Sequence, residues 1–259
     1  MTIIEEATNI LNKYNQNHIK VKTNELANQI MNIDFKQLEG LFEYATKRTS
    51  AEPIEEIEPV DAIISDKMEK DEKEECITIG ENEVKKGKLA IAIMAGGQGT
   101  RLEHNGPKGT FKLELNSEEK SLFEIIVDKL KTAKKMYNID LNCYIMTSPE
   151  NHNDTVKFFE ENNYFGYSKD YIKFFKQGEL PLLDKNGKLI LGENGLIKLA
   201  SDGNGGIFYS MDKNGIIKDM KNKNIEWLFI GSVDNLLVKY VDVLLLGMAI
   251  KKNVKIATR

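Results

Sequence analysis

The chain has 259 residues, 41% of them hydrophobic, which is enough for one large domain or for a domain with an appendage. Its net charge of −4 argues against a general nucleic-acid-binding protein, because such proteins usually carry a basic surface. The two cysteines, Cys76 and Cys143, match no zinc-binding spacing, and no apolar stretch approaches the roughly 20 residues that span a bilayer.

Residues 1–50 predict a helical N-terminal appendage. Apolar residues recur at helical spacing near the start, and again after Asp34, which forms a plausible helix cap with Gln37 three residues later. The polar faces mix both signs of charge, so packing on the main domain is favoured over a membrane surface or a partner helix. Glu5 and Glu6 come too early for a signal peptide. We therefore expect a cytoplasmic protein with no membrane, nucleic-acid or protein partner indicated.

Residues 51–86 differ in composition from their surroundings. They contain Pro53, Pro59 and a run of charges from 66 to 75. Such a run is typical of a solvated connector, although the paired carboxylates Glu74 and Glu75 also allow an acid/base interpretation. The catalytic domain is then expected to occupy residues 87–259.

The stretch from 89 to 115 is the most informative part of the chain. Residues 89–95 are an unbroken apolar run, typical of a parallel strand buried on both faces. The turn that follows is rich in glycine, with Gly96, Gly97 and Gly99. Consecutive N–H groups at a strand end suit phosphate oxygens, and Arg101 and Lys108 add two positive charges. This pattern predicts a polyphosphate site at the carboxyl end of a strand.

This stretch does not match two other known glycine-rich motifs. A P-loop requires a lysine and then a serine or threonine directly after its last glycine, but Gly99 is followed by Thr100 and Arg101. The dinucleotide-binding fingerprint requires a third glycine at the position that Leu102 occupies.

The following residues alternate between helical and strand patterns. Ser121 and Glu124 have the spacing of a capping box before a helix with one apolar side. Further elements are expected at 141–146 (strand), 155–161 (helix), 172–175 (strand), 216–221 (helix), 226–231 (strand), 236–251 (helix) and 254–257 (strand). The alternation predicts an α/β fold with a Rossmann-like, doubly wound and mostly parallel sheet.

The segment from 179 to 206 interrupts this alternation. Residues 184–188 predict a turn that leads into a short strand at 189–191. Residues 202–206, DGNGG, are too rich in glycine for a regular element. They are either a flexible hairpin tip or a second wall of the phosphate site, and the first glycine-rich loop favours the second interpretation.

Several of these segments together resemble a known family. The run AGGQGTRL at 95–102, followed by GPKG at 106–109, is similar to the signature of eukaryotic-type UDP-N-acetylglucosamine pyrophosphorylases and related UDP-sugar pyrophosphorylases. Later segments agree in the same order, at 144–148, 174–178, 202–206 and 233–235. The resemblance covers roughly residues 50–258. It implies a nucleotide-diphospho-sugar transferase fold and a uridylyltransferase that makes a UDP-sugar and pyrophosphate from UTP and N-acetylglucosamine 1-phosphate or glucose 1-phosphate.

That reaction is an in-line attack of one phosphate on the α-phosphorus of UTP, so it needs positive charge and positioning more than an acid/base pair. We expect Arg101 to offer bidentate donors to the departing pyrophosphate, and Lys108 to place its charge at the α-phosphate.

The resemblance further implies which residues bind the substrates. It places Met94, Ala95, Gly96 and Gly97 along the nucleotide pocket. It places Gln177 against the uracil, where an amide can donate to a carbonyl and accept from N3–H. An ordinary polar residue at a strand end is the alternative for Gln177. The resemblance also implies that Gly203 contacts the nucleotide and Asn204 the sugar.

Asp234 is the candidate metal ligand. It follows a predicted strand, and Mg²⁺ accepts such a carboxylate together with phosphate oxygens and waters. Capping of the next helix is the alternative. The metal interpretation is favoured chiefly because the resemblance places a metal or nucleotide contact there.

The chain also departs from the family pattern. Family members are longer, and their sugar-binding half continues beyond residue 259 with further lysines that contact substrate. An alternative function is therefore a catalytically incomplete fragment that binds UTP or a UDP-sugar. A glycosyltransferase is a third alternative, but its usual Asp-x-Asp metal motif is absent around Asp234.

Overall fold

The computed structural model describes residues 1–46, 62–115 and 118–258. The chain divides into two compact units. We call the described residues of Met1–Val60 and Glu179–Asp202 the helical unit, and those of Asp61–Gly178 and Gly203–Arg259 the sheet unit. The sequence prediction placed 179–202 in the catalytic domain, whereas here this segment groups with the N-terminal helices.

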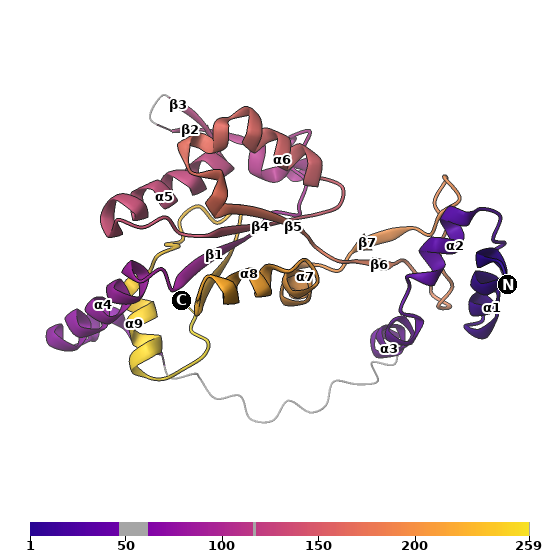
Figure 1. The fold of residues 1–259 in the computed structure, drawn as a ribbon, viewed down its shortest axis with the longest axis horizontal. Coiled ribbons are helices and arrows are strands. Elements are labelled where there is room, and N and C mark those ends of the chain that lie inside the picture. Colours follow the sequence, from indigo (N-terminus) through magenta and orange to yellow (C-terminus); the bar gives the residue numbers. More distant parts are fainter. Residues whose placement is uncertain (47–61, 116–117, 259) are drawn as a thin grey trace. The chain divides into compact units, whose positions relative to one another are not determined.

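The sheet unit is built on four parallel strands (Figure 1). They are β1 (Leu89–Met94), β4 (Cys143–Thr147), β5 (Ile172–Lys176) and β8 (Trp227–Ser232). Their order is β5-β4-β1-β8, so β1 lies in the interior of the sheet, and every pairing is parallel. This confirms the predicted α/β fold with a mostly parallel sheet.

Helices cover both faces of this sheet (Figure 1). On one face lie α5 (Leu122–Tyr137) and α6 (His152–Glu161), and on the other lie α7 (Ile207–Lys213) and α8 (Ile216–Asn222). Successive side chains of a strand point to opposite faces, so the side chains of β1 alternate between two hydrophobic cores. Ile91 and Ile93 pack with Phe123 of α5, while Ala90 and Ala92 pack with residues of α7 and α8. A strand buried on both faces explains why residues 89–95 are all apolar.

The helices α4 (Lys70–Lys85) and α9 (Val243–Lys251) pack closely against each other. The sequence prediction treated residues 51–86 as a connector. Part of that range lies outside the described residues. Within the described part, residues 70–85 are helical. Cys76, Gly80 and Val84 are buried at a spacing of four, which gives the charged segment one buried stripe. A Cβ on Gly80 would lie 1.9 Å from the backbone oxygen of Val243, so the contact requires glycine.

The helical unit contains α1 (Ile3–Lys13), α2 (Asn24–Met31) and α3 (Phe35–Thr46), with the two-stranded antiparallel sheet of β6 (Glu179–Pro181) and β7 (Leu199–Ser201). The Asp34 side chain accepts a hydrogen bond from the Gln37 N–H before α3, as predicted. The turn expected at 184–188 is present, but residues 189–191 form only isolated bridges rather than a strand.

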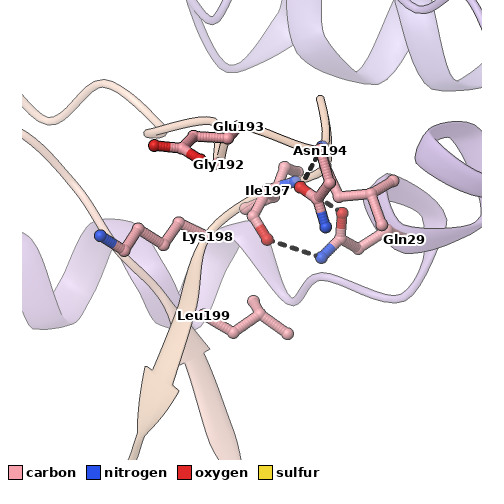
Figure 2. Close-up of a pocket in the computed structure, with 8 residues that line it drawn as sticks. Gln29, Gly192, Glu193, Asn194, Ile197, Lys198 and Leu199 are labelled. Atoms are coloured by element: carbon pink, nitrogen blue, oxygen red, sulfur yellow. Dashed lines mark hydrogen bonds between the residues drawn. The ribbon is translucent and has the colours of Figure 1, made fainter.

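Side chains of the N-terminal helices bind the segment between β6 and β7. Gln29 accepts a hydrogen bond from the Ile197 N–H at 2.7 Å and donates to the Ile197 carbonyl at 2.8 Å (Figure 2). Gln16 makes the same kind of paired contact with Gly187 and Leu189. A surface hollow lined by Gln29 and by residues 192–194 and 196–199 contains none of the predicted site residues.

Other elements differ from the prediction or were missed by it. The last helix begins at Val243 rather than 236, and residues 254–257 form no strand. Helix α7 and the hairpin of β2 (Lys112–Leu115) and β3 (Glu118–Ser121) were not predicted. Short 3-10 helices lie at Ser65–Lys67, Thr100–Leu102, Lys108–Thr110, Asn163–Gly166, Lys169–Tyr171 and Asn204–Gly206. Among the described helices, none has the length and apolar character needed to span a membrane.

Candidate functional site

The candidate site lies where the carboxyl ends of the four parallel strands meet. The Ala95 N–H donates to the Met146 carbonyl at 2.7 Å, which continues the pairing of β1 with β4 by one residue. On the other side, the Val233 N–H donates to the Met94 carbonyl at 3.1 Å. The residues that follow β1, β4 and β8 therefore share one edge of the sheet, the usual ligand position in an open α/β sheet.

The glycine-rich loop after β1 folds back on itself. The Gly99 N–H donates to the Gly106 carbonyl at 2.9 Å, and the Lys108 N–H donates to the Gly97 carbonyl at 3.0 Å. Gly106 has φ +140°, a conformation that favours glycine. The loop thus returns Lys108, 14 residues after β1 ends, to the start of the turn.

Backbone donors of this loop lack partners. In the part of the chain that the structure describes, the N–H groups of Gly96, Gly97 and Gln98 make no hydrogen bond within the protein. Gly97 is exposed, so the donors are reached from solvent. Three successive backbone N–H groups of this kind form a concavity that suits phosphate oxygens.

The predicted charges at this edge form an ion pair. The Lys108 Nζ donates to Asp234 Oδ2 at 2.9 Å, and the Ser232 Oγ donates to Asp234 Oδ1 at 2.5 Å. The hydrogen bonds from Ser232 and Lys108 hold the pKa of the Asp234 carboxyl below its ordinary value. Asp234 is half exposed and ionised at neutral pH, and each oxygen keeps a further lone pair. This donor set fits Mg²⁺ bound by one carboxylate with phosphate oxygens and waters.

Gln177 lies against the first glycine of the loop. A Cβ built on Gly96 would lie 2.5 Å from the Gln177 Oε1, so only glycine allows the amide its present position. Gln177 is 7% exposed, and its N–H donates to the Thr147 carbonyl at 2.8 Å at the end of β4. The Gln177 amide therefore lies directly against the glycine-rich loop.

Gly203 and Asn204 precede α7 and are exposed. Gly203 has φ +79°, and residues 204–206 form a 3-10 turn. Helix α7 is fixed near Gln177, because the Gly178 N–H donates to the Ser210 Oγ at 3.0 Å. The turn thus leads into a helix that contacts the Gln177 strand end.

The structure brings five of the ten predicted site residues into direct contact. Gly97 with Lys108, Lys108 with Asp234, and Gly96 with Gln177 are neighbours. Arg101 lies in the 3-10 turn Thr100–Leu102 and is exposed; it makes no ion pair with any described residue. Arg101 is therefore connected to the other site residues through the backbone of the glycine-rich loop.

Sequence reasoning missed two polar residues of the site. Ser232 binds the Asp234 carboxylate, and Asn151 binds two carbonyls of the glycine-rich loop. Asn151 directly precedes α6, so the sequence offered a helix-cap signal. No sequence pattern indicated that its side chain contacts residues more than 50 positions earlier.

The chain is similar to known proteins over most of its length. The family model described as UTP–glucose-1-phosphate uridylyltransferase matches residues 34–258. The chain is 38% identical to the UDP-N-acetylglucosamine pyrophosphorylase of Saccharomyces cerevisiae over 70% of its own length and 39% of that protein. It is 32% identical to UDP-N-acetylglucosamine diphosphorylase 2 of Arabidopsis thaliana over 90% of its own length and 49% of that protein.

A solved structure shows the same relationship. The uridine diphosphate N-acetylglucosamine pyrophosphorylase from Trypanosoma brucei superposes with a TM-score of 0.78 and 27% identity, over 98% of this chain and 55% of that one. The chain thus spans about half the length of these relatives or less. Because the family model matches most of the sequence, the chain belongs to the UTP–glucose-1-phosphate uridylyltransferase family.

Proposed function

We propose that the protein transfers a uridylyl group from UTP to a sugar 1-phosphate and releases pyrophosphate, as a cytoplasmic nucleotidyltransferase. The observation that carries this proposal is the cluster of N–H groups at Gly96, Gly97 and Gln98, which have no partner among the described residues, beside the Lys108 ammonium. The names of the relatives favour N-acetylglucosamine 1-phosphate as the acceptor, with glucose 1-phosphate as the alternative.

The chain's own residues supply positioning and positive charge. The N–H groups of Gly96 and Gly97 hold phosphate oxygens, and Met94 and Ala95 shape the nucleotide pocket beneath them. Lys108 stabilises the charge that develops at the α-phosphate, since a fixed cation in a partly desolvated site acts strongly on a transition state. Arg101, which has no ion pair within the described residues, is available to the leaving pyrophosphate.

Gln177 provides the base selectivity in this proposal. Its amide donates to a uracil carbonyl and accepts from N3–H, a pattern that cytosine does not offer. Gly203 and Asn204 then contact the nucleotide and the sugar from the turn before α7. Asp234 would hold Mg²⁺, which when bound would neutralise phosphate charge.

The cytoplasmic location is supported by the state of the cysteines. Cys76 and Cys143 are both buried free thiols. Burial raises the pKa of the Cys143 thiol to about 12, so this group is unreactive. Free, unpaired cysteines are typical of a reducing compartment.

The alternative is a protein that binds UTP or a UDP-sugar without completing the transfer. The chain spans about half the length of the relatives or less. The two functions share the nucleotide site and differ in turnover.

The test is pyrophosphate release from UTP and Mg²⁺, with N-acetylglucosamine 1-phosphate and glucose 1-phosphate in parallel. Lys108→Ala is expected to lower the rate by about 10² or more and UTP affinity far less. Lys112→Ala is the matched control, because Lys112 is a nearby exposed lysine in β2. UTP binding without pyrophosphate release from either sugar would support the binding function, and no UTP binding would exclude both.

A further inference from the structure

Asn151 is a fully buried polar residue beside the glycine-rich loop. It is 0% exposed and is the residue that directly precedes α6, in the turn after β4. Its side chain extends away from its own helix and reaches the loop after β1, 54 to 56 positions earlier in the chain.

Both ends of the Asn151 amide are used. Its Nδ2 donates to the Ala95 carbonyl at 3.1 Å and to the Gly97 carbonyl at 3.3 Å. Its Oδ1 accepts from the Ser148 N–H at 2.9 Å, while the Ser148 Oγ accepts from the Asn151 N–H at 3.1 Å. The Oδ1 end therefore closes the turn before α6, and the Nδ2 end holds the loop.

Asn151 holds the Ala95 carbonyl and shares the Gly97 carbonyl with the Lys108 N–H, which donates to it at 3.0 Å. These contacts fix the direction of two N–H groups. The peptide bond is planar and trans, so the carbonyl of one residue and the N–H of the next point in opposite directions; no described peptide is cis. With the Ala95 and Gly97 carbonyls aimed at Asn151, the N–H groups of Gly96 and Gln98 point away from it. These are two of the three loop donors that lack a partner in the described protein.

We propose that Asn151 is a positioning residue for phosphate binding, which aims the N–H groups of Gly96 and Gln98 at the nucleotide by holding the carbonyls of Ala95 and Gly97. This inference rests on the proposed function, because it assumes that the glycine-rich loop binds the phosphates of UTP. Preorganised donors bind an anion more tightly than donors that must first be ordered.

The two ends of the amide allow the positioning role to be separated from the closing of the turn before α6, because the Asn151 side chain makes no capping hydrogen bond to that helix. Asn151→Asp keeps the Oδ1 that caps the turn and removes the two donors, and aspartate is also a favourable residue before a helix. Asn151→Ala removes the donors without adding charge. Ser148→Ala is the matched control, because it alters the same buried turn and leaves the Nδ2 contacts in place.

The experiment compares the binding of two ligands by calorimetry and NMR titration. UTP with Mg²⁺ carries the phosphates, and uridine carries only the base and ribose. Both Asn151 variants are expected to weaken UTP binding by about tenfold, since hydrogen bonds to charged groups are strong. Uridine binding should stay within about twofold in all variants, and Ser148→Ala should bind both ligands like the unaltered protein.

The outcomes separate this inference from the proposed function. If the unaltered protein does not bind UTP, the proposed function fails, and this inference fails with it. If it binds UTP and both variants bind equally well, only the role of Asn151 is refuted. Equal loss of UTP and uridine binding would show a merely structural role. Loss of UTP binding confined to Asn151→Asp would show charge repulsion and refute the positioning role. If the alanine variant does not fold, the aspartate variant is measured at high salt. A deficit in its UTP binding that disappears at high salt would likewise show charge repulsion and refute the positioning role.

Discussion

Replacing Gly96 by alanine tests the link between the glycine-rich loop and base recognition. The new Cβ would lie 2.5, 2.8 and 3.0 Å from the Gln177 Oε1, Cδ and Nε2. Ordinary contact begins near 3.4 Å, so the amide must retreat by about 0.9 Å. Because the amide ends a flexible side chain, the fold should survive. A displacement of this size removes well-directed hydrogen bonds, so we expect UTP affinity to fall by about 10- to 100-fold.

The assay is UTP binding in a double-mutant cycle. Gly96→Ala, Gln177→Ala and the double variant are compared with the unaltered protein by calorimetry. If the alanine acts through the Gln177 amide, it should cost little once that amide is absent. Gly97→Ala is the control for folding, because its Cβ would lie no closer than 3.9 Å to Lys108 Cε. Additive effects of the two substitutions would refute the reasoning.

Three further predictions concern the ion pair and the packing within each of the two units. Lys108→Met should raise the pKa of the Asp234 carboxyl toward its ordinary 3.8, as measured by NMR titration. In the unaltered protein the depressed pKa of Asp234 contributes stability that is present above pH 3.8 and is lost as pH falls below it. Gly247→Ala places a Cβ 1.7 Å from a backbone oxygen of α4 and should lower the free energy of unfolding in urea by about 2 to 3 kcal/mol. Gly40→Ala lies in open space within α3 and should raise the free energy of unfolding by about 0.5 to 1 kcal/mol. Gln29→Leu should cost about 1 to 2 kcal/mol and speed amide hydrogen exchange in residues 190–198; unchanged exchange there would contradict the role of Gln29 in holding this segment.

The sheet was predictable because its strands carry strong local signals. The unbroken apolar run at 89–95 follows from burial on both faces, and Ser121 accepts a hydrogen bond from the Glu124 N–H before α5 as its spacing indicated. Residues 254–257 include three apolar residues but form no strand. A strand needs a partner for its N–H and C=O groups, and this requirement is set by the rest of the fold rather than by the segment.

The grouping of residues 179–202 with the N-terminal helices could not be predicted for a related reason. Gln16 and Gln29 are ordinary polar residues in the sequence, and their role arises only when their amides meet backbone groups about 170 residues away. The same holds for Asn151, whose cap position was visible and whose long-range contacts were not. Local patterns predicted the elements, whereas polar contacts between distant segments fixed their arrangement.

The ion pair between Lys108 and Asp234 affects the binding of a polyphosphate in two opposite ways. The net charge is −4, so attraction must come from local donors. In the free protein Asp234 neutralises Lys108 and holds its side chain in place, which reduces the entropy lost when a phosphate binds. Asp234→Asn should therefore strengthen UTP binding without metal, because repulsion between carboxylate and phosphate is removed. It should also lower turnover with Mg²⁺. Calorimetry with and without Mg²⁺ measures this, and weaker metal-free binding in the variant would refute the predicted repulsion and show that the positioning of Lys108 by Asp234 outweighs it.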